Sequence, residues 1–294
     1  MRLRGKSLFQ FIKLKPIYLK FLFLRASVAK ISFLAKTSLS NKSLKIWLLL
    51  KHKNQIMELL KGKNVLLTGA TGSIGSKTAK LLLSSGANIF ITGRNEEKLK
   101  AIAAELNLDS NTYLAIDISN TEQVQQLKER FFAVYPTIDI LVNAAGIGII
   151  KPMDTLTENE FLKTLNYNLY GPFLLLKHFL PAMKEVKKGL IINIPGVLGK
   201  VPMAGAAAYT ASKYGLVGMM QSIREEVKRT DIRITNLFLG GVDSSFWDTI
   251  DLRVQRDKMI VADEAAKAIW FLCQQPVSGV VSEMVLQPFN HQAI

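Results

Sequence analysis

A short apolar run that leads through a glycine-rich turn into a helical stretch constrains the fold of this 294-residue chain more than any other feature. Residues 65–67 read Val-Leu-Leu, residues 68–75 read Thr-Gly-Ala-Thr-Gly-Ser-Ile-Gly, and residues 77–83 have a helical pattern. Glycines allow the backbone to approach a ligand closely, and the start of a helix favours an anion. The segment therefore predicts the first strand, turn and helix of a dinucleotide-binding unit.

The same alternation continues along the chain. Short apolar runs at 88–92, 114–118 and 138–142 are separated by helical patterns such as 121–134, and each run ends on polar or small residues. Alternating strands and helices are typical of βαβ units with a parallel sheet. We expect a single α/β domain with a Rossmann-type, doubly wound parallel sheet in three layers, and ligands at the carboxyl ends of its strands.

The residue that closes the second predicted strand indicates which dinucleotide is bound. An acidic side chain there holds the ribose 2′-hydroxyl of NAD, whereas an arginine accommodates the 2′-phosphate of NADP. This chain has Arg94 at that point, although a solvated arginine at the start of a helix is the alternative interpretation. The sequence thus predicts NADP(H) as the cofactor in preference to NAD(H).

A tyrosine with a lysine four residues on is a candidate for acid–base chemistry. Tyr209 and Lys213 fall at the start of an alanine-rich helical stretch, so both side chains are expected on one face. A phenol has a reference pKa of about 10, and a nearby ammonium group favours the phenolate. Taken alone, the pair is more typical of an ordinary surface helix. The motifs around it make it a catalytic candidate.

In order and spacing, these motifs resemble the short-chain dehydrogenase/reductase family in its compact single-domain form, over roughly residues 60–288. The resemblance implies that the glycine turn binds the cofactor pyrophosphate and that an aspartate contacts the adenine. It also implies that an Asn-x-Ala-Gly segment lies under the cofactor and that a later loop meets the nicotinamide. The cofactor-binding residues implied here are Gly69, Gly72, Ser73, Ile74, Gly75, Asp117, Asn143, Ala144, Gly146, Gly240, Val242 and Ser244.

The resemblance also implies catalytic roles. Tyr209 matches the general acid/base, Lys213 matches the lysine that binds the nicotinamide ribose, and Asn168 matches the asparagine that organises a water-linked proton relay. Phe246 and Trp247 fall in the loop that begins the substrate lid. The apolar residues of this loop suggest that part of the substrate is apolar, and the implied substrate is a small carbonyl or alcohol compound.

Three features depart from the family pattern: residue 196, the spacing of the glycine turn, and Leu239, where a proline is common. Relatives place a serine that hydrogen-bonds the substrate carbonyl thirteen residues before the tyrosine, and this chain has Gly196 there. Loss of one such donor costs about 2.7 to 4 kcal/mol unless another group replaces it; Asn193, Ser244, Ser245 or a water are candidates. The glycine turn has the spacing Gly-x-x-Gly-x-x-Gly of the extended branch. Only 81 residues follow Lys213, too few for the additional domain of that branch.

Two functional hypotheses follow. The first is an NADP(H)-dependent enzyme that interconverts a carbonyl and an alcohol by hydride transfer, with Tyr209 as general acid/base and Gly196 in the substrate loop. The second is a cofactor-binding pseudoenzyme that acts as a sensor or scaffold. It rests on Gly196 alone, because that position lacks the expected hydroxyl.

Positive charge is concentrated at the N-terminus. Residues 1–64 carry 15 Lys and Arg against one acid, Glu58, whereas the other 230 residues carry 23 basic and 22 acidic side chains. Nearly all of the net charge of +15 belongs to this stretch, so the basic composition gives no support for a nucleic acid partner. Lysine or arginine at positions 13, 15, 20, 25, 30 and 36 interrupts every apolar run before the roughly 20 residues that a membrane span needs.

We expect a basic extension at residues 1–56 and the reductase domain at residues 57–294. The extension could be a targeting peptide, a peripheral anchor in weak contact with a membrane surface, or an upstream stretch included by a wrong choice of start codon. We favour the last, because Met57 opens the sequence as a compact reductase does. A cytoplasmic location is then expected, with an organelle or a membrane surface as the alternatives. A single cysteine, Cys273, fits a reducing compartment.

Two further expectations concern metals and subunits. The three histidines, His52, His178 and His291, lie far apart in sequence, and no Cys/His cluster suggests a metal. The stretches 157–186 and 209–228 have helical spacing, and in the family the outer faces of such helices pair between subunits. We therefore expect a homodimer or homotetramer.

Overall fold

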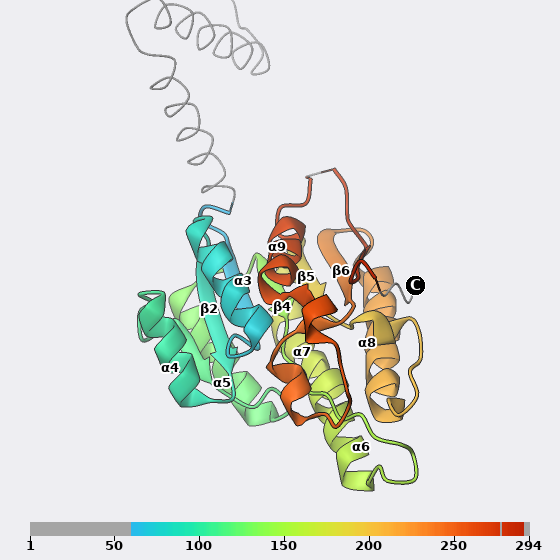
Figure 1. Ribbon diagram of the computed structural model, residues 1–294. Coiled ribbons are helices and arrows are strands. Elements are labelled where there is room, and N and C mark those ends of the chain that lie inside the picture. Colours follow the sequence, from blue (N-terminus) through green and yellow to red (C-terminus); the bar gives the residue numbers. More distant parts are fainter. Residues whose placement is uncertain (1–59, 277, 291–294) are drawn as a thin grey trace, which may run out of the picture. The chain divides into compact units, whose positions relative to one another are not determined.

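Seven parallel strands form the central sheet, in the order β3-β2-β1-β4-β5-β6-β9 (Figure 1). This order reverses direction between β1 and β4, as it does in a doubly wound sheet, and it confirms the Rossmann-type fold predicted from the sequence. The strands are β1 (Asn64–Thr68), β2 (Asn88–Gly93), β3 (Tyr113–Ala115), β4 (Ile140–Asn143), β5 (Lys188–Asn193), β6 (Asp231–Leu239) and β9 (Glu283–Leu286).

The computed structural model describes residues 60–276 and 278–290. The basic extension predicted at residues 1–56, and the domain start predicted at residue 57, lie outside the described residues. Within the described part of the chain, no helix is long and apolar enough to cross a lipid bilayer.

Helices cover both faces of the sheet and give the predicted three layers (Figure 1). One face packs against α3 (Ser73–Ser84), α4 (Glu96–Glu105) and α9 (Ala262–Leu272). The other face packs against three longer helices, which are α5 (Thr121–Val134), α7 (Gly171–Glu185) and α8 (Ala207–Val227). Helix α6 (Glu158–Leu165) precedes α7 in the chain.

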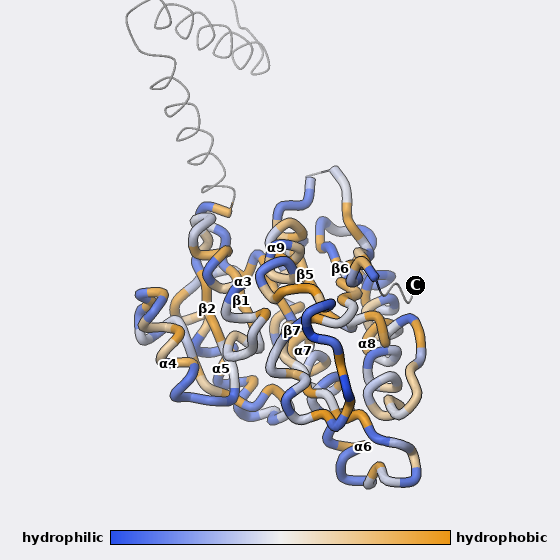
Figure 2. The backbone as a smooth tube through the Cα atoms, in the orientation of Figure 1, coloured by the Kyte–Doolittle hydropathy of each residue, from blue (hydrophilic) through white to orange (hydrophobic). Residues whose placement is uncertain are grey.

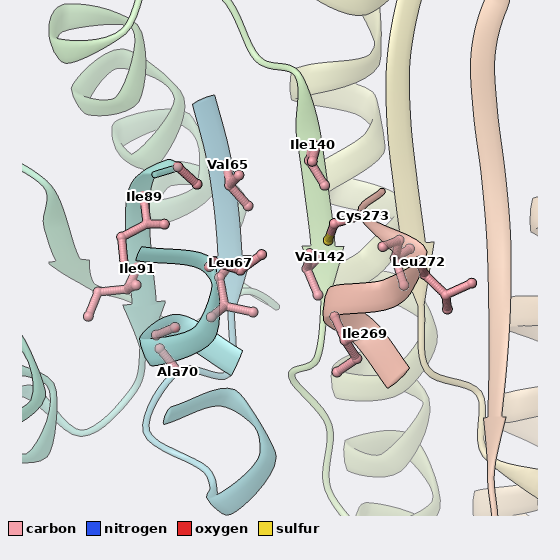
Figure 3. Close-up of a cluster of buried hydrophobic side chains, with 14 of the residues drawn as sticks. Val65, Leu67, Ala70, Ile89, Ile91, Ile140, Val142, Ile269, Leu272 and Cys273 are labelled. Carbon is pink, nitrogen blue, oxygen red and sulfur yellow. The ribbon is translucent and has the colours of Figure 1, made fainter. Parts of the chain in front are cut away.

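Successive side chains along a strand point to opposite faces of the sheet and so belong to different hydrophobic cores. Val65 and Leu67 of β1 belong to the core on the α3 side, whereas Leu66 between them belongs to the core on the α5 side. The buried middle residues of strands such as β2 and β5 are apolar, as Figure 2 shows. In Figure 3, Val142 of β4 lies beside Ile269 and Leu272 of α9, and side chains of β1 and β2 belong to the same cluster.

The helical stretch expected from Thr157 to Val186 is divided. Thr157 caps α6 through a reciprocal pair of hydrogen bonds with Glu160, and α6 ends at Leu165. A π-helix at Asn166–Tyr170 then joins it to α7. Single-turn π-bulges inside longer helices often occur at functional sites, and this one contains Asn168.

The carboxyl ends of the central strands carry a row of buried polar residues. Paired positions across β1, β4, β5 and β6 are Thr68, Asn143, Asn193 and Asn236, and each is buried. Beyond this row, a short parallel pair forms between β7 (Val242–Asp243) and β8 (Ile260–Val261), and it brackets the predicted lid. The edge of the sheet predicted to bind ligands is therefore where the polar residues gather.

Candidate active site

The glycine turn between β1 and α3 has a shape that only glycine allows. Gly69 has a φ of +69°, and a Cβ atom on it would lie 2.7 Å from the backbone of Ala144 and Ala145. A Cβ atom on Gly75 would lie 2.1 Å from the carbonyl oxygen of Gly69. Neither position accepts a side chain unless backbone moves. The turn thus exposes backbone at the sheet edge, as the close approach of a phosphate requires.

The start of α3 provides a favourable field for an anion. Gly72 precedes the helix and has no side chain with which to cap it, and the first turn contains no acidic residue. Ser73 opens the helix and accepts a hydrogen bond at 3.3 Å from the backbone N–H of Ser245, while Ile74 packs against the core. A helix N-terminus with this composition favours a pyrophosphate.

Arg94 and Asp117 lie near each other beyond the ends of β2 and β3. The Arg94 guanidinium lies 4.4 Å from the ring centroid of Tyr167, whose hydroxyl donates to Asp117 Oδ2 at 2.5 Å. Ser119 donates to Asp117 Oδ1 through both its backbone N–H and its hydroxyl. Burial acts to raise the pKa of Asp117, but these hydrogen bonds and the Arg94 charge hold that pKa below its usual range. The carboxylate is therefore charged and fixed in place.

Asn143 ends β4, and Ala144 and Gly146 follow it, between the glycine turn and the catalytic candidates. Asn143 is buried and donates from Nδ2 to Oδ1 of Asn193 at 2.8 Å, across the paired ends of β4 and β5. Ala144 contributes the backbone against which Gly69 packs. A Cβ atom on Gly146 would lie 3.1 Å from Oδ1 of Asn168, so glycine leaves room for that side chain.

Tyr209 and Lys213 share one face of α8, as the spacing predicts. The Nζ atom of Lys213 lies 5.4 Å from the centroid of the Tyr209 ring and donates to the carbonyl oxygen of Ile194 at 3.1 Å. Lys213 is buried and Tyr209 is partly buried. The helix thus places an ammonium group next to a phenol at the sheet edge.

Asn168 reaches the same place from the π-helix. Its Oδ1 atom accepts from the backbone N–H of Ile147, and its Nδ2 atom donates to the Ile147 carbonyl, both at 2.9 Å. Nδ2 also donates to the Ser212 hydroxyl at 3.1 Å, and that hydroxyl donates to the Tyr209 carbonyl at 2.6 Å. Three hydrogen bonds therefore tie the π-helix to the loop after β4 and to α8.

Burial dominates the protonation of the pair. It raises the pKa of the Tyr209 phenol above its ordinary value, and it lowers the pKa of the Lys213 ammonium to about 8. The net direction for the phenol in the protein alone is therefore opposite to the lowering expected from a nearby ammonium group. Taking both groups out of water favours their neutral forms.

Gly196 lies beside the Tyr209 hydroxyl. A Cβ atom built on it would be 4.0 Å from that oxygen and 3.4 Å from the Leu239 carbonyl. Its φ of +70° and ψ of 170° belong to a region that essentially only glycine occupies. One of the expected substitute donors is engaged elsewhere, because the Ser244 hydroxyl donates to the Val242 carbonyl at 3.3 Å. Asn193 is fully buried and accepts from Asn143 through Oδ1, and its Nδ2 group has no hydrogen-bond partner among the described residues.

The loop after β6 lies next to this position. A Cβ atom on Gly240 would lie 2.6 Å from Pro288, so the chain passes closely between β6 and the residues after β9. The Val242 carbonyl accepts from the Ser244 hydroxyl at 3.3 Å and from Nε1 of Trp247 at 3.0 Å. These bonds fold the first residues of the predicted lid back on β7.

Phe246 covers the phenol. Its ring centroid lies 5.7 Å from that of Tyr209 and 5.1 Å from that of Trp247, both edge-on. A Cβ atom on Gly148 would lie 2.2 Å from Phe246 Cζ, so the ring fits only because residue 148 lacks a side chain. An apolar cluster surrounds these rings and includes Ile150, Leu198, Ala206 and Ile250.

The site as a whole fits a dinucleotide. The glycines of the turn leave a cradle that any Cβ atom would fill, and the start of α3 suits the pyrophosphate. Arg94 and Asp117 lie where the second and third strands end, and Lys213 and Tyr209 lie beyond β5. The polar groups therefore follow the edge of the sheet from an anion-binding end to an acid–base end.

Comparison with known proteins agrees with this geometry. A family profile described as short chain dehydrogenase matches residues 63–254, more than half of the chain. The chain belongs to the short-chain dehydrogenase/reductase family. It is 31% identical over 235 residues to a 3-oxoacyl-(acyl-carrier-protein) reductase of Rickettsia felis, covering 77% of this chain and 95% of that protein. It is 29% identical to an oxidoreductase of Staphylococcus saprophyticus, covering 79% of this chain and 98% of that protein.

Solved structures of this family superpose on the dehydrogenase. A metagenomic short-chain oxidoreductase in complex with NADP has 33% identity and a TM-score of 0.68, covering 78% of this chain and 98% of that one. An alcohol dehydrogenase from the archaeon Thermococcus sibiricus, complexed with 5-hydroxy-NADP, has 25% identity and a TM-score of 0.72. That match covers 80% of this chain and all of the other. This short-chain dehydrogenase is therefore an oxidoreductase with a Rossmann fold.

Sequence reasoning missed three residues that shape the site of this short-chain dehydrogenase. They are Tyr167, which contacts Arg94 and Asp117, Ser212, which holds Asn168, and Gly148, which admits Phe246. Tyr167 and Ser212 each directly precede a predicted catalytic residue. Their position next to Asn168 and Lys213 could have drawn attention to them. Their contacts could not be predicted, because the partners lie 50 and 44 positions away in the sequence.

Proposed function

We propose that this short-chain dehydrogenase interconverts a carbonyl compound and an alcohol with NADP(H), and that Tyr209 is its general acid/base. One observation carries the proposal: Tyr209, Lys213 and Asn168 come from two separate helices and meet at the sheet edge that also carries the glycine turn. If the Tyr and Lys spacing were a coincidence on an ordinary surface helix, the two side chains would not be expected to lie beside Asn168 and the glycine turn.

The residues divide the reaction between them. A bound NADPH would supply a hydride to the carbonyl carbon. The Tyr209 hydroxyl donates its proton to the carbonyl oxygen. Burial raises the pKa of the Tyr209 phenol, so the phenol is protonated at neutral pH. Lys213, which donates to the Ile194 carbonyl beyond β5, would bind the nicotinamide ribose. Asn168, which is fixed by its bonds to Ile147, would orient a water that returns a proton to Tyr209.

NADP(H) is favoured over NAD(H) by the residue at the end of β2. Arg94 stands where an acidic residue would select the 2′-hydroxyl, and a guanidinium fork suits a 2′-phosphate. The metagenomic relative is complexed with NADP, and the archaeal relative with 5-hydroxy-NADP. Both agree with the preference that Arg94 predicts.

The substrate portion next to Tyr209 is apolar. Phe246, Trp247 and Ile250 from the lid meet Ile150 and Leu198 around the phenol. Apolar walls with a few placed polar groups are typical of small-molecule sites. The named relatives include a reductase of 3-oxoacyl groups and an alcohol dehydrogenase, so ketones, aldehydes and acyl thioesters are the compounds to test.

The decisive experiment measures cofactor oxidation with NADPH and NADH across that panel, for the wild-type chain and for Tyr209→Phe. We expect turnover with NADPH, a loss of at least about 100-fold in Tyr209→Phe, and unchanged NADPH binding. Tyr214→Phe is the matched control, because Tyr214 lies on the same helix and its hydroxyl donates to the Lys200 carbonyl. Full activity in Tyr209→Phe would refute the assignment of Tyr209 as general acid/base.

The same measurements test the second hypothesis. Tight NADPH binding with no turnover on any compound would favour the pseudoenzyme that Gly196 suggests.

We also propose that the subunit partner is a second copy of this chain. Leu162, Tyr170 and Phe173 are exposed on α6, the π-helix and α7. An apolar groove between these elements and α8 is lined by Leu169 and Met219 among others. Large apolar patches on a surface are typical of interfaces. Light scattering on the purified chain tests the proposal, and a monomer at micromolar concentration would contradict it.

A further inference from the structure

Arg94, the side chain expected to bind the 2′-phosphate, lies over an aromatic ring. It is an exposed side chain at the end of β2, and long exposed arginines lose considerable rotamer freedom when they are fixed. Here the guanidinium lies 4.4 Å from the centroid of the Tyr167 ring. An arginine stacked on an aromatic face keeps its N–H groups at the edge of the plane, where they remain free to bind an anion.

The Tyr167 ring is itself held in place. Its hydroxyl donates to Asp117 Oδ2 at 2.5 Å, and the other carboxylate oxygen accepts two hydrogen bonds from Ser119, at 2.8 and 2.6 Å. Tyr167 is half-buried on the π-helix, one residue before the buried Asn168. The aromatic surface under Arg94 is therefore anchored at both ends, by the backbone of the π-helix and by a fixed carboxylate.

Acidic side chains close to the end of β2 affect where the Arg94 guanidinium lies. The first turn of α4 carries Glu96 and Glu97, which repel a phosphate, although Glu96 pairs with Lys100 at 2.6 Å. These acidic residues would also draw an unsupported arginine toward themselves. Stacking on Tyr167 opposes that displacement.

We infer that Tyr167 is a positioning residue for cofactor selection: its ring holds Arg94 where the guanidinium can bind the 2′-phosphate of NADP(H). This inference rests on the proposed NADP(H) preference. A stacked arginine at an exposed site gains only a few-fold in affinity from the ring, so Tyr167 adjusts a selectivity that Arg94 supplies.

Binding of two fragments by calorimetry tests the inference without any substrate. The probes are 2′,5′-ADP, which has the 2′-phosphate, and 5′-AMP, which lacks it. The ratio of their affinities reports discrimination at the 2′ position alone. We expect Arg94→Ala to lower this ratio at least about tenfold, since it removes charge-assisted hydrogen bonds. We expect Tyr167→Leu to lower it about two- to fivefold, and Tyr167→Phe, which keeps the ring, to retain most of it.

A double-mutant cycle separates positioning from a merely structural role. In the Arg94→Ala background, Tyr167→Leu should leave the ratio unchanged, because the ring then has no guanidinium to hold. Tyr167→Gln, which also lacks a ring, serves as a second variant if Tyr167→Leu does not fold. An unchanged ratio in the ring-free variants, or equal losses for both fragments, would overturn the inference while Arg94→Ala still lowered the ratio. If Arg94→Ala also had no effect, the NADP(H) preference itself would fail.

Discussion

The two ends of the site are specified in different ways. At the phosphate end, between β1 and α3, the limits are steric and act on the backbone: Cβ atoms on Gly69 and Gly75 would lie 2.7 and 2.1 Å from other backbone atoms. At the acid–base end, side chains from distant elements meet, and Gly196 stands beside Tyr209 where relatives have a serine. The first end tolerates almost no change, whereas the second has already changed and kept its acid–base residues in place.

The largest expected effect follows from the phosphate end. Gly75→Ala places a Cβ atom 2.1 Å from a backbone oxygen, and the clash can only be relieved by separating α3 from the turn. We expect the free energy of unfolding to fall by about 3 kcal/mol or more, and NADPH binding to be lost. Urea denaturation and calorimetry measure the two effects.

Gly218→Ala is the matched control for that substitution. Gly218 lies within α8, and a Cβ atom on it meets nothing within 4 Å. Alanine is favoured over glycine in a helix, so this variant should be about 0.5 to 1 kcal/mol more stable than the wild type. Equal stability of the two variants would show that the turn relaxes easily, and the contrast between the two ends of the site would then disappear.

Local features of the site could be predicted from the sequence. The turn, the alternation of strands and helices, and the shared face of Tyr209 and Lys213 all depend on residues close together in the chain or on simple periodicity. The end of β4 could be located because its apolar run stops at Asn143, whereas the apolar run predicted at 114–118 continues past β3, which ends at Ala115. These features follow from steric rules that act over a few residues.

Other features could not be predicted, because they depend on contacts between distant residues. The contact of Tyr167 with Asp117 spans 50 positions, and the π-helix at Asn166–Tyr170 interrupts a stretch that has an ordinary helical pattern. The direction of the Tyr209 pKa depends on burial, which the sequence does not report. The positive φ of Gly196 likewise appears only in the folded chain.

A smaller effect is expected at the acid–base end, from Gly196→Ser and Gly196→Ala. Because the backbone of Gly196 lies in a region that other residues rarely adopt, both variants should lose about 1 to 3 kcal/mol of unfolding free energy. Only serine brings a donor near the Tyr209 hydroxyl, so we expect it to turn over small ketones about tenfold faster than alanine. Thermal unfolding measures the backbone strain, and kcat/KM measures the effect of the added hydroxyl on the reaction. Identical kcat/KM values for the two variants would mean that a hydroxyl at this position has no productive geometry.

The smallest expected effect concerns the cost of burying Lys213. Burial lowers its folded-state pKa to about 8, whereas an exposed lysine in the unfolded chain titrates near 10.5. Between these values the unfolded state binds more protons than the folded state, so unfolding free energy should rise with pH across this window. From about pH 7.5 to about pH 9.5 the expected gain is about 1 to 2 kcal/mol, below the range in which the Tyr209 phenol ionises. Lys213→Met removes the titrating group and should flatten this part of the curve relative to wild type. Parallel curves for the two proteins would show that the lysine keeps its charge at no cost, and that the acid–base end is better solvated than its packing indicates.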